Sequence, residues 1–424
     1  MRQTFCHKWS KNETTERNLH FIDVNGCYAE ASRLFLYPTG KASILIDKYL
    51  DDISFDGEAL KSSKKQIYGL IKAQILPSHT CEPMFPLKFK DKIFYVYCKK
   101  CLETGSKKPC QHTSIERSFC VTTTVQALNF AMKNKFIELI QIFEIWDHEK
   151  EEPVFQKFVN ILLDLKENVL KDKSSQKFIK HGLQMSFGKL STNPNHKKQF
   201  LCKDFNQLND VFVKYSDISN ITPIDDQLCS VTVIDKGAPK KTNYSSLILG
   251  SHITWAARVF LEMKLQEIRN NFENVELLML QTDAAVLTIP SNLKLEDKIV
   301  FSSSNGAWKH QFPLCREITN FYSLNAATYC IIYKDYDNQI RQINKIAGFC
   351  LQSISPKLDR NEFENLLLSA IKGISTSNEM QQIVTLKKEN CKKEMVFSLK
   401  NTIDSKRIPL ENFKSLAYGH KCFN

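Results

Sequence analysis

The chain has 424 residues, 42% hydrophobic and 25% charged, an ordinary globular composition with enough apolar side chains for two or three domains. Lys and Arg outnumber Asp and Glu by 58 to 46, and the resulting charge of +12 favours a polyanionic partner such as nucleic acid, although an evenly spread solubility charge would give the same total. The polar N-terminus and the lack of an apolar run near ~18 residues argue against a signal peptide and a membrane partner. The 14 cysteines are therefore expected to be reduced, in the cytoplasm or the nucleus.

The first informative segment begins at residue 20, after a polar stretch in which no regular structure is expected. Residues 20–28 read His-Phe-Ile-Asp-Val-Asn-Gly-Cys-Tyr, an apolar run that predicts a strand and is interrupted by Asp23. A buried carboxylate is costly unless it is paired or ligates a metal. Asp23 is therefore either a water-facing residue of an edge strand or a metal ligand. A short helix is predicted to residue 36, and another strand at 66–77.

A strand at 92–97 leads into a cluster of candidate metal ligands. Cys98 and Cys101 form a Cys-x-x-Cys pair, and Cys110 and His112 form a Cys-x-His pair shortly after it. This spacing is typical of a tetrahedral, structural zinc site, in which four protein ligands leave no open position for catalysis. Free thiols in a polar loop remain the alternative.

Two helices are predicted at 155–170 and 176–189, and the basic turn between them indicates an antiparallel hairpin. On the second helix Lys180, Gln184 and Phe187 follow the spacing i, i+4, i+7 and share one face. A cation suits a triphosphate and a ring can stack on a base, and Lys166 would supply a second phosphate contact. The alternative is that Phe187 belongs to a core and that the lysines face water.

A second carboxylate interrupts an apolar strand much later in the chain. After a polar stretch at 191–245 and a predicted long helix at about 250–270, residues 277–287 read Leu-Leu-Met-Leu-Gln-Thr-Asp-Ala-Ala-Val-Leu. If this strand lies beside the first one, Asp23 and Asp283 surround one site. Two carboxylates that hold two divalent ions suit phosphoryl or nucleotidyl transfer.

In this order the segments resemble the motifs of a family B DNA polymerase, of the protein-primed kind found in phages, linear plasmids, transposons and related viruses. Residues 23–28 resemble motif A (D-x-x-S-L-Y-P), residues 180–189 the fingers motif (K-x-x-x-N-S-x-Y-G), and residues 280–284 motif C (Y-x-D-T-D-S). Three further segments are similar to the palm helix before motif C, the primer-gripping K-x-Y motif and a later basic strand: 253–258, 327–329 and 345–349. The resemblance implies an α+β right-hand fold with a palm sheet, two-helix fingers, a small thumb and a zinc-knuckle insertion.

The resemblance also implies roles for single residues. Asp23 and Asp283 would be the catalytic ligands of Mg²⁺ or Mn²⁺, and Tyr28 would exclude a ribose 2′-hydroxyl. The implied nucleotide-binding residues are Val24, Tyr28, Lys166, Lys180, Gln184 and Phe187. The implied DNA-binding residues are Thr254, Arg258, Gly188, Lys189, Tyr329 and Lys345. The cluster from Cys98 to His112 is similar to an insertion of the transposon-type and viral members, which implies structural Zn²⁺.

The implied function is that of a DNA-directed DNA polymerase, which adds dNTPs to a primer 3′-hydroxyl on a DNA template. Only about 20 residues precede Asp23, where the family carries its exonuclease, so proofreading is not expected; priming by a terminal protein stays open. The predicted domains are the N-terminal segment with motif A, a terminal-protein-region-like insertion with the cysteine cluster, the fingers, a second insertion, the palm with motif C, and the thumb. Their bounds are 1–38, 39–150, 151–190, 191–245, 246–355 and 356–424.

The chain departs from these motifs at several positions. The substituted positions are Gly26, Cys27 and Ala29 in motif A, Gln184, Met185 and Phe187 in the fingers, Gln281 and Ala284 in motif C, and Ala327 in K-x-Y. The retained Asp23, Asp283 and Lys180 favour an active polymerase. The substitutions favour a degenerate relic of a mobile element or virus that binds DNA but is catalytically weak or inactive. A basic zinc protein that binds DNA without nucleotidyl chemistry is the third reading.

Overall fold

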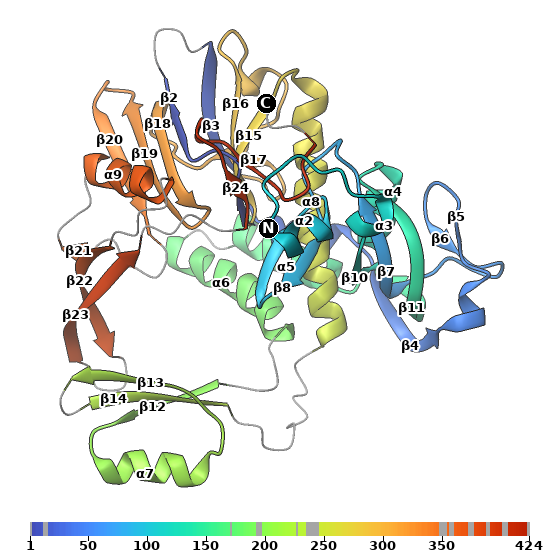
Figure 1. Cartoon of the computed structure of the whole chain (residues 1–424), viewed down its shortest axis with the longest axis horizontal. Helices are drawn as coiled ribbons and strands as arrows, with labels where there is room; N and C mark the ends of the chain where they lie inside the picture. Colours follow the sequence, from blue (N-terminus) through green and yellow to red (C-terminus); the bar gives the residue numbers. More distant parts are fainter. Residues whose placement is uncertain are drawn as a thin grey trace. The chain divides into compact units, whose positions relative to one another are not determined.

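The structure is a computed structural model that describes residues 2–11, 16–169, 172–191, 197–225, 228–234, 246–346, 354–355, 360–371, 377–386, 391–400 and 406–421. Figure 1 shows the described helices and strands, coloured along the sequence. The chain divides into two compact units. The first unit contains Met1–Ile161 and His252–Asn424, and the second unit contains Leu162–Ser251. Among the described helices, none combines the length and the apolar character that crossing a membrane requires.

A five-stranded antiparallel sheet with the order β1-β15-β16-β3-β17 lies at the centre of the first unit. Its strands are β1 (Arg2–Thr4), β3 (Arg17–Val24), β15 (Glu276–Gln281), β16 (Ala284–Pro290) and β17 (Trp308–His310). Alternate residues of β3 face opposite sides, as the period of a strand requires. Ile22 and Val24 pack with Phe260 of helix α8 (Leu247–Asn271), whereas Phe21 packs with Phe321 of a second sheet.

The second sheet has the order β2-β18-β19-β20. Its strands are β2 (Lys8–Ser10), β18 (Cys315–Asn325), β19 (Thr328–Asp335) and β20 (Ile340–Lys345), and helix α9 (Arg360–Ile371) packs on it through Phe363 and Leu367. The expectation that residues 1–19 lack regular structure is wrong, because β1 pairs with β15 and β2 pairs with β18. Both pairings join residues about 300 positions apart, so no local pattern could reveal them.

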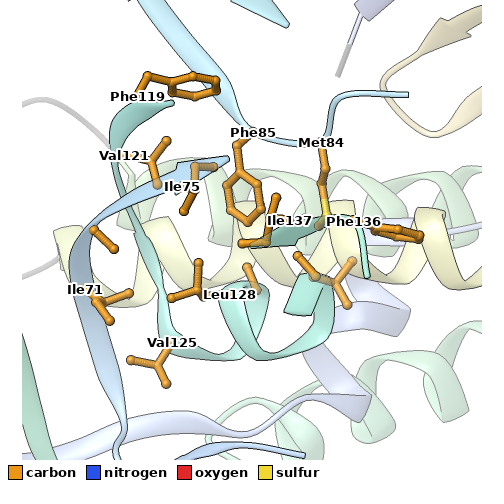
Figure 2. Packing of buried hydrophobic residues seen from close by; sticks show 14 of the residues in the cluster. Ile71, Ile75, Met84, Phe85, Phe119, Val121, Val125, Leu128, Phe136 and Ile137 are labelled. Carbon is orange, nitrogen blue, oxygen red and sulfur yellow. The ribbon is translucent and has the colours of Figure 1, made fainter. Parts of the chain in front are cut away.

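A third antiparallel sheet, with the order β10-β7-β11-β4, is built from β4 (Tyr37–Leu45), β7 (Gly69–Pro77), β10 (Phe119–Thr124) and β11 (Ile137–Glu152). Figure 2 shows its core, in which Ile71 and Ile75 of β7 lie beside Leu128 of helix α4 (Val125–Lys133). The smaller elements in this part of the first unit's sequence are α1 (Cys27–Leu34), a 3-10 turn (Asp47–Leu50), β5 (Ser54–Phe55), β6 (Leu60–Lys61), β8 (Pro86–Phe89), β9 (Lys92–Tyr95), α2 (Lys99–Thr104) and α3 (Ser114–Arg117). A further 3-10 turn spans Leu295–Asp297.

The described C-terminal segment, residues 406–421, packs against parts of the chain that are far away in sequence. It contains β24 (Ile408–Pro409) and β25 (Ser415–Leu416), and Ser415 N–H donates to the carbonyl of Phe5 at 2.8 Å. Further along, Tyr97 N–H donates to the carbonyl of Tyr418 at 2.9 Å, and Cys110 N–H donates to that of His420 at 3.1 Å. The stretch before it contains α9, β21 (Ile354–Ser355), β22 (Ser377–Leu386) and β23 (Cys391–Lys400).

The second unit contains most of the predicted helical hairpin and a small separate sheet. The first helix differs from the prediction, because α5 (Gln156–Asp164) gives way to a π-helical turn at Leu165–Val169 before α6 (Lys173–Leu190) begins. Asp172 caps α6 by accepting from Ser175 N–H at 2.8 Å. The polar stretch 191–245 contains β12 (Lys197–Cys202), α7 (Phe205–Lys214), β13 (Ile218–Asp225) and β14 (Leu228–Ile234), with the sheet order β12-β14-β13.

Candidate active site and metal centre

The two carboxylates singled out by sequence lie at the same end of the central sheet. Asp23 is the penultimate residue of β3 and pairs with Ala284, the first residue of β16. Asp283 lies in the turn between β15 and β16, where Thr282 adopts a left-handed φ of 60°. Val24 N–H donates to the carbonyl of Asp283 at 3.0 Å, so the two segments are in direct contact.

The negative charges of Asp23 and Asp283 are only partly compensated by their surroundings. Burial raises the pKa of Asp283, and the nearby charge of Asp23 raises that pKa further. Such a pair of oxygen ligands fits a divalent cation, whose charge would relieve both effects. The donor set therefore suits Mg²⁺ or Mn²⁺.

Lys309 is a site residue that the sequence did not reveal. It lies on β17 as the strand partner of Asp23, and its Nζ is 2.7 Å from Asp23 Oδ2 and 3.5 Å from Asn25 Oδ1. Its charge lowers the pKa of Asp283, against the larger effects of burial and Asp23. A lysine in a three-residue strand carries no local signal, because only the pairing of β17 with β3 places it here.

Tyr28 lies one turn beyond Asp23, near the start of α1. The turn before it depends on Gly26, whose φ is 59° and whose position would place a Cβ 2.1 Å from Asn305 Oδ1. Burial raises the pKa of the Tyr28 phenol, and the charge of Asp283 adds to the increase. Tyr28 therefore lies within electrostatic range of the carboxylates.

Lys345 is also electrostatically linked to Asp283. Burial lowers the pKa of Lys345, the charge of Arg2 lowers it further, and the charge of Asp283 raises it. The residue as a whole is still exposed, so this desolvation is partial. Lys345 pairs with Tyr329 across β19 and β20, and its Nζ lies 5.7 Å from the centre of the Tyr329 ring. The Tyr329 ring itself is buried, with its centre 5.7 Å from that of Phe21, and burial raises its pKa to about 12.

The two predicted DNA-binding residues of α8 differ in their surroundings. Thr254 is exposed, whereas Arg258 is partly buried and bound within the chain. Arg258 Nη2 donates to Tyr95 Oη at 2.8 Å, and its guanidinium lies 4.5 Å from the centre of the Trp255 ring. Arg258 thereby joins α8 to β9.

The predicted fingers residues belong to α6 and to the π-helical turn of the second unit. Gln176 Nε2 donates to the carbonyl of Lys166 at 3.2 Å, which ties these two segments together. Lys180 and Gln184 are exposed, as are Gly188 and Lys189. Phe187 is buried, although its spacing in the sequence predicts that it shares one face with Lys180 and Gln184.

The four candidate zinc ligands converge. The Sγ atoms of Cys98, Cys101 and Cys110 lie 3.5, 3.2 and 3.6 Å from His112 Nδ1, and all four ligand atoms lie within 4.8 Å of one another. Cys101 N–H also donates to Cys98 Sγ at 3.3 Å at the start of α2. Burial raises the pKa of the Cys98 and Cys101 thiols, and a bound cation would oppose that increase. The donor set and its size fit tetrahedral Zn²⁺.

Comparisons with known proteins give a family and a fold. The sequence model of the family described as DNA polymerase type B, organellar and viral, matches residues 5–246. No curated protein matches the chain. A phi29 DNA polymerase complexed with primer-template DNA (post-translocation binary complex) is similar in structure, with a TM-score of 0.56 and 14% identity over 95% of this chain and 61% of that one.

The orthorhombic crystal form of phi29 DNA polymerase is also similar, with a TM-score of 0.54 and 13% identity over 94% of this chain. The match covers 61% of that polymerase, so this chain spans about three fifths of its length. At such identities the likeness is one of fold, and that fold is the right-hand polymerase fold expected from the motifs.

Proposed function

The chain belongs to the type B DNA polymerases of organelles and viruses, and from that premise we propose that it is a DNA-directed DNA polymerase. Its substrates would be dNTPs and a DNA template-primer, as in the phi29 DNA polymerase complexed with primer-template DNA and incoming nucleotide substrates. One observation carries the proposal: Asp23 and Asp283 meet at one end of the central sheet, where Asp23 pairs with Ala284 and Val24 contacts Asp283. Two adjacent carboxylates are what two-metal nucleotidyl transfer requires.

The proposed chemistry assigns each residue one task. Asp23 and Asp283, with the backbone of Val24, would hold Mg²⁺ or Mn²⁺, which when bound offsets charge on the phosphates and activates the primer hydroxyl. Tyr28 would contact the sugar of the nucleotide. Lys166, Lys180 and Gln184 would contact its triphosphate and base, and Phe187 could do so only if its buried ring became exposed. The proposed DNA contacts are the exposed Thr254, Gly188, Lys189 and Lys345, and the partly buried Arg258. Tyr329, whose ring is buried, would act through Lys345, whose Nζ lies 5.7 Å from the ring centre.

A second candidate is a polymerase relic that binds DNA but has lost catalysis. Gln281 favours it, because this residue pairs with Ala284 beside Asp283 and is neutral where the motif has a carboxylate. Ala327 lacks the cation of the K-x-Y motif. Each loss could lower the rate tenfold for every ~1.4 kcal/mol of transition-state stabilisation that is removed.

Primer extension decides between these candidates. A primed template is incubated with dNTPs and either Mg²⁺ or Mn²⁺, using the unmodified chain, Asp23→Asn, Asp283→Asn and the control Asp91→Asn, whose side chain is 95% exposed. We expect extension by the unmodified chain and the control, and a loss of about 100-fold or more in both site variants. Absent extension with both metals, together with salt-dependent DNA binding, would support the relic. A nucleotide transferred to a protein rather than to the DNA primer would assign a protein primer.

We also propose that Cys98, Cys101, Cys110 and His112 hold a structural Zn²⁺. Elemental analysis of the purified chain should find about one zinc per molecule, since four such ligands form a closed tetrahedral site. Cys101→Ser should lose the zinc and unfold at a lower temperature, whereas Cys120→Ser, at an exposed cysteine, should change neither. Equal zinc content in Cys101→Ser and the unmodified chain would contradict the assignment.

A further inference from the structure

The ion pair between Lys309 and Asp23 lies where the proposed function needs a divalent cation. Nζ of Lys309 is 2.7 Å from Asp23 Oδ2, and the Asp23 side chain is only 14% exposed. The register fixes this contact, because Lys309 is paired with Asp23 across β17 and β3. Lysine is a compact point charge with three donors, so it can neutralise a carboxylate that has no metal.

A metal ion and the ammonium group cannot both approach Asp23 without repelling each other. Mg²⁺ binds carboxylate oxygens at about 2.0–2.1 Å, so on the same carboxylate the two cations would stand only a few ångströms apart. At such distances like charges repel each other even in water, and the repulsion is stronger at a partly buried site. The charge of Lys309 also reaches Asp283, whose pKa it lowers.

We propose that Lys309 is an internal counter-ion of the active site, which neutralises Asp23 before a metal arrives and competes with the metal for that carboxylate. The inference rests on the proposed function, in which Asp23 is a metal ligand. Binding of the divalent ion must move the ammonium away from Oδ2 or bear its repulsion. Without the charge of Lys309, the two carboxylates would therefore bind a divalent ion more tightly than they do in the unmodified chain.

Binding of Mn²⁺ to the 424-residue chain, followed by electron paramagnetic resonance without DNA or nucleotide, tests this competition. Binding that persists in Asp23→Asn is subtracted, so that only binding at this site is counted. We expect Lys309→Met and Lys309→Gln to bind Mn²⁺ about tenfold more tightly than the unmodified chain, which corresponds to ~1.4 kcal/mol. Lys309→Arg should keep the unmodified affinity, because it keeps the charge.

Lys294→Met is the matched control. Lys294 is exposed and follows Pro290, at the opposite end of β16 from Ala284, so its loss changes the net charge without touching Asp23. We expect its Mn²⁺ affinity to be unchanged. If Lys294→Met gained as much Mn²⁺ affinity as the Lys309 variants, the change in net charge would explain the effect, and the inference would be overturned.

Structural damage and loss of the competing ammonium change the Mn²⁺ affinity in opposite directions. A distorted site binds Mn²⁺ less tightly, whereas a site without the competing ammonium binds it more tightly. If Lys309→Met and Lys309→Gln both show Asp23-dependent Mn²⁺ binding that is no tighter than in the unmodified chain, the inference is overturned but the proposed function is not. No Asp23-dependent binding in the unmodified chain or in the variants would overturn both the inference and the proposed metal-ligand role of Asp23. Thermal unfolding of each variant establishes that it is folded, and the Gln variant keeps a hydrogen-bond donor toward Asp23 if Met is not tolerated.

Discussion

Asp283 is a residue whose charge conflicts with its surroundings in the absence of metal. Burial is the larger cause of its raised pKa, and the negative charge of Asp23 is the second. The folded chain therefore binds the Asp283 proton more tightly than the unfolded chain does. Stability is lost as the pH rises through the folded-state pKa, because ionised Asp283 is disfavoured in the fold.

Asp283→Asn should therefore be more stable than the unmodified chain when neither Mg²⁺ nor Mn²⁺ is added. At pH 7 the expected gain in the free energy of unfolding is on the order of 1–2 kcal/mol, the size of one relieved like-charge contact. The gain should shrink as the pH falls and Asp283 becomes protonated. Urea unfolding at several pH values measures it, with Asp91→Asn as the exposed control. A less stable Asp283→Asn at pH 7 would contradict this account.

At the same scale, sequence could predict that Asp23 and Asp283 meet, but it did not indicate Lys309. Each Asp interrupts an apolar strand, and that local pattern is visible in the sequence. Lys309 contacts Asp23 only because β17 pairs with β3 in one register. Such pairings connect distant residues and leave no local pattern.

Among the elements, β11 contains a carboxylate that titrates near neutrality. Burial raises the pKa of Glu151 to about 7 from its ordinary 4.5, although a hydrogen bond from Gln126 Nε2 to Glu151 Oε1 at 2.8 Å opposes the increase. Because the pKa of Glu151 is higher in the folded chain than in the unfolded chain, the folded chain holds an extra proton between pH 4.5 and about pH 7. The stability associated with that proton is lost as the pH rises from about 4.5 through about 7.

Glu151→Gln should remove this pH dependence, because the amide is neutral and its oxygen can still accept from Gln126. At pH 8 the variant should gain ~2 kcal/mol of stability over the unmodified chain, while at pH 5 the two should be nearly equal. Unfolding in urea at both pH values measures the difference. Glu138→Gln, at an exposed position of the same strand, is the control. A constant offset between variant and parent at both pH values would contradict the assignment.

Elements with strong local periodicity could be predicted, and others could not. The helix at 247–271 and the strand at 69–77 agree with the predicted positions because their apolar residues recur at helical and strand spacing. Strands β1 and β2 are three residues long and exist through their partners β15 and β18. The π-helical turn at Leu165–Val169 keeps nearly helical spacing, so it resembles an α-helix in the sequence.

For the molecule as a whole, Arg407 joins the C-terminal segment to two distant parts of the first unit. Its buried guanidinium donates to Gln3 Oε1 at 2.9 Å, contacts Glu82 Oε2 at 3.2 Å and donates to the carbonyl of Ser415 at 3.0 Å. It also lies 4.4 Å from the centre of the Phe5 ring. Removing it would take a charged donor away from these acceptors, which is costly at a buried position.

Arg407→Met should lower the free energy of unfolding by about 3 kcal/mol, the cost of breaking a buried charged network by removing one partner. Residues 406–421 should also become more sensitive to limited proteolysis. Lys414→Met is the matched control, because its ion pair with Glu276 (2.8 Å) is half exposed and should contribute at most about 1 kcal/mol. Equal effects of the two substitutions would contradict the proposed role of Arg407.

The contact between Ser415 and Thr4 has a consequence for the order of events during synthesis. The two residues are 411 positions apart, and β1, which contains Thr4, pairs with the strand that leads to Asp283. At about 5–20 residues per second, a ribosome needs roughly 20–80 s to travel from one residue to the other. Until then β1, at the edge of the central sheet, lacks its contact with Ser415. The contact at this edge therefore forms late, after residue 415 has been translated.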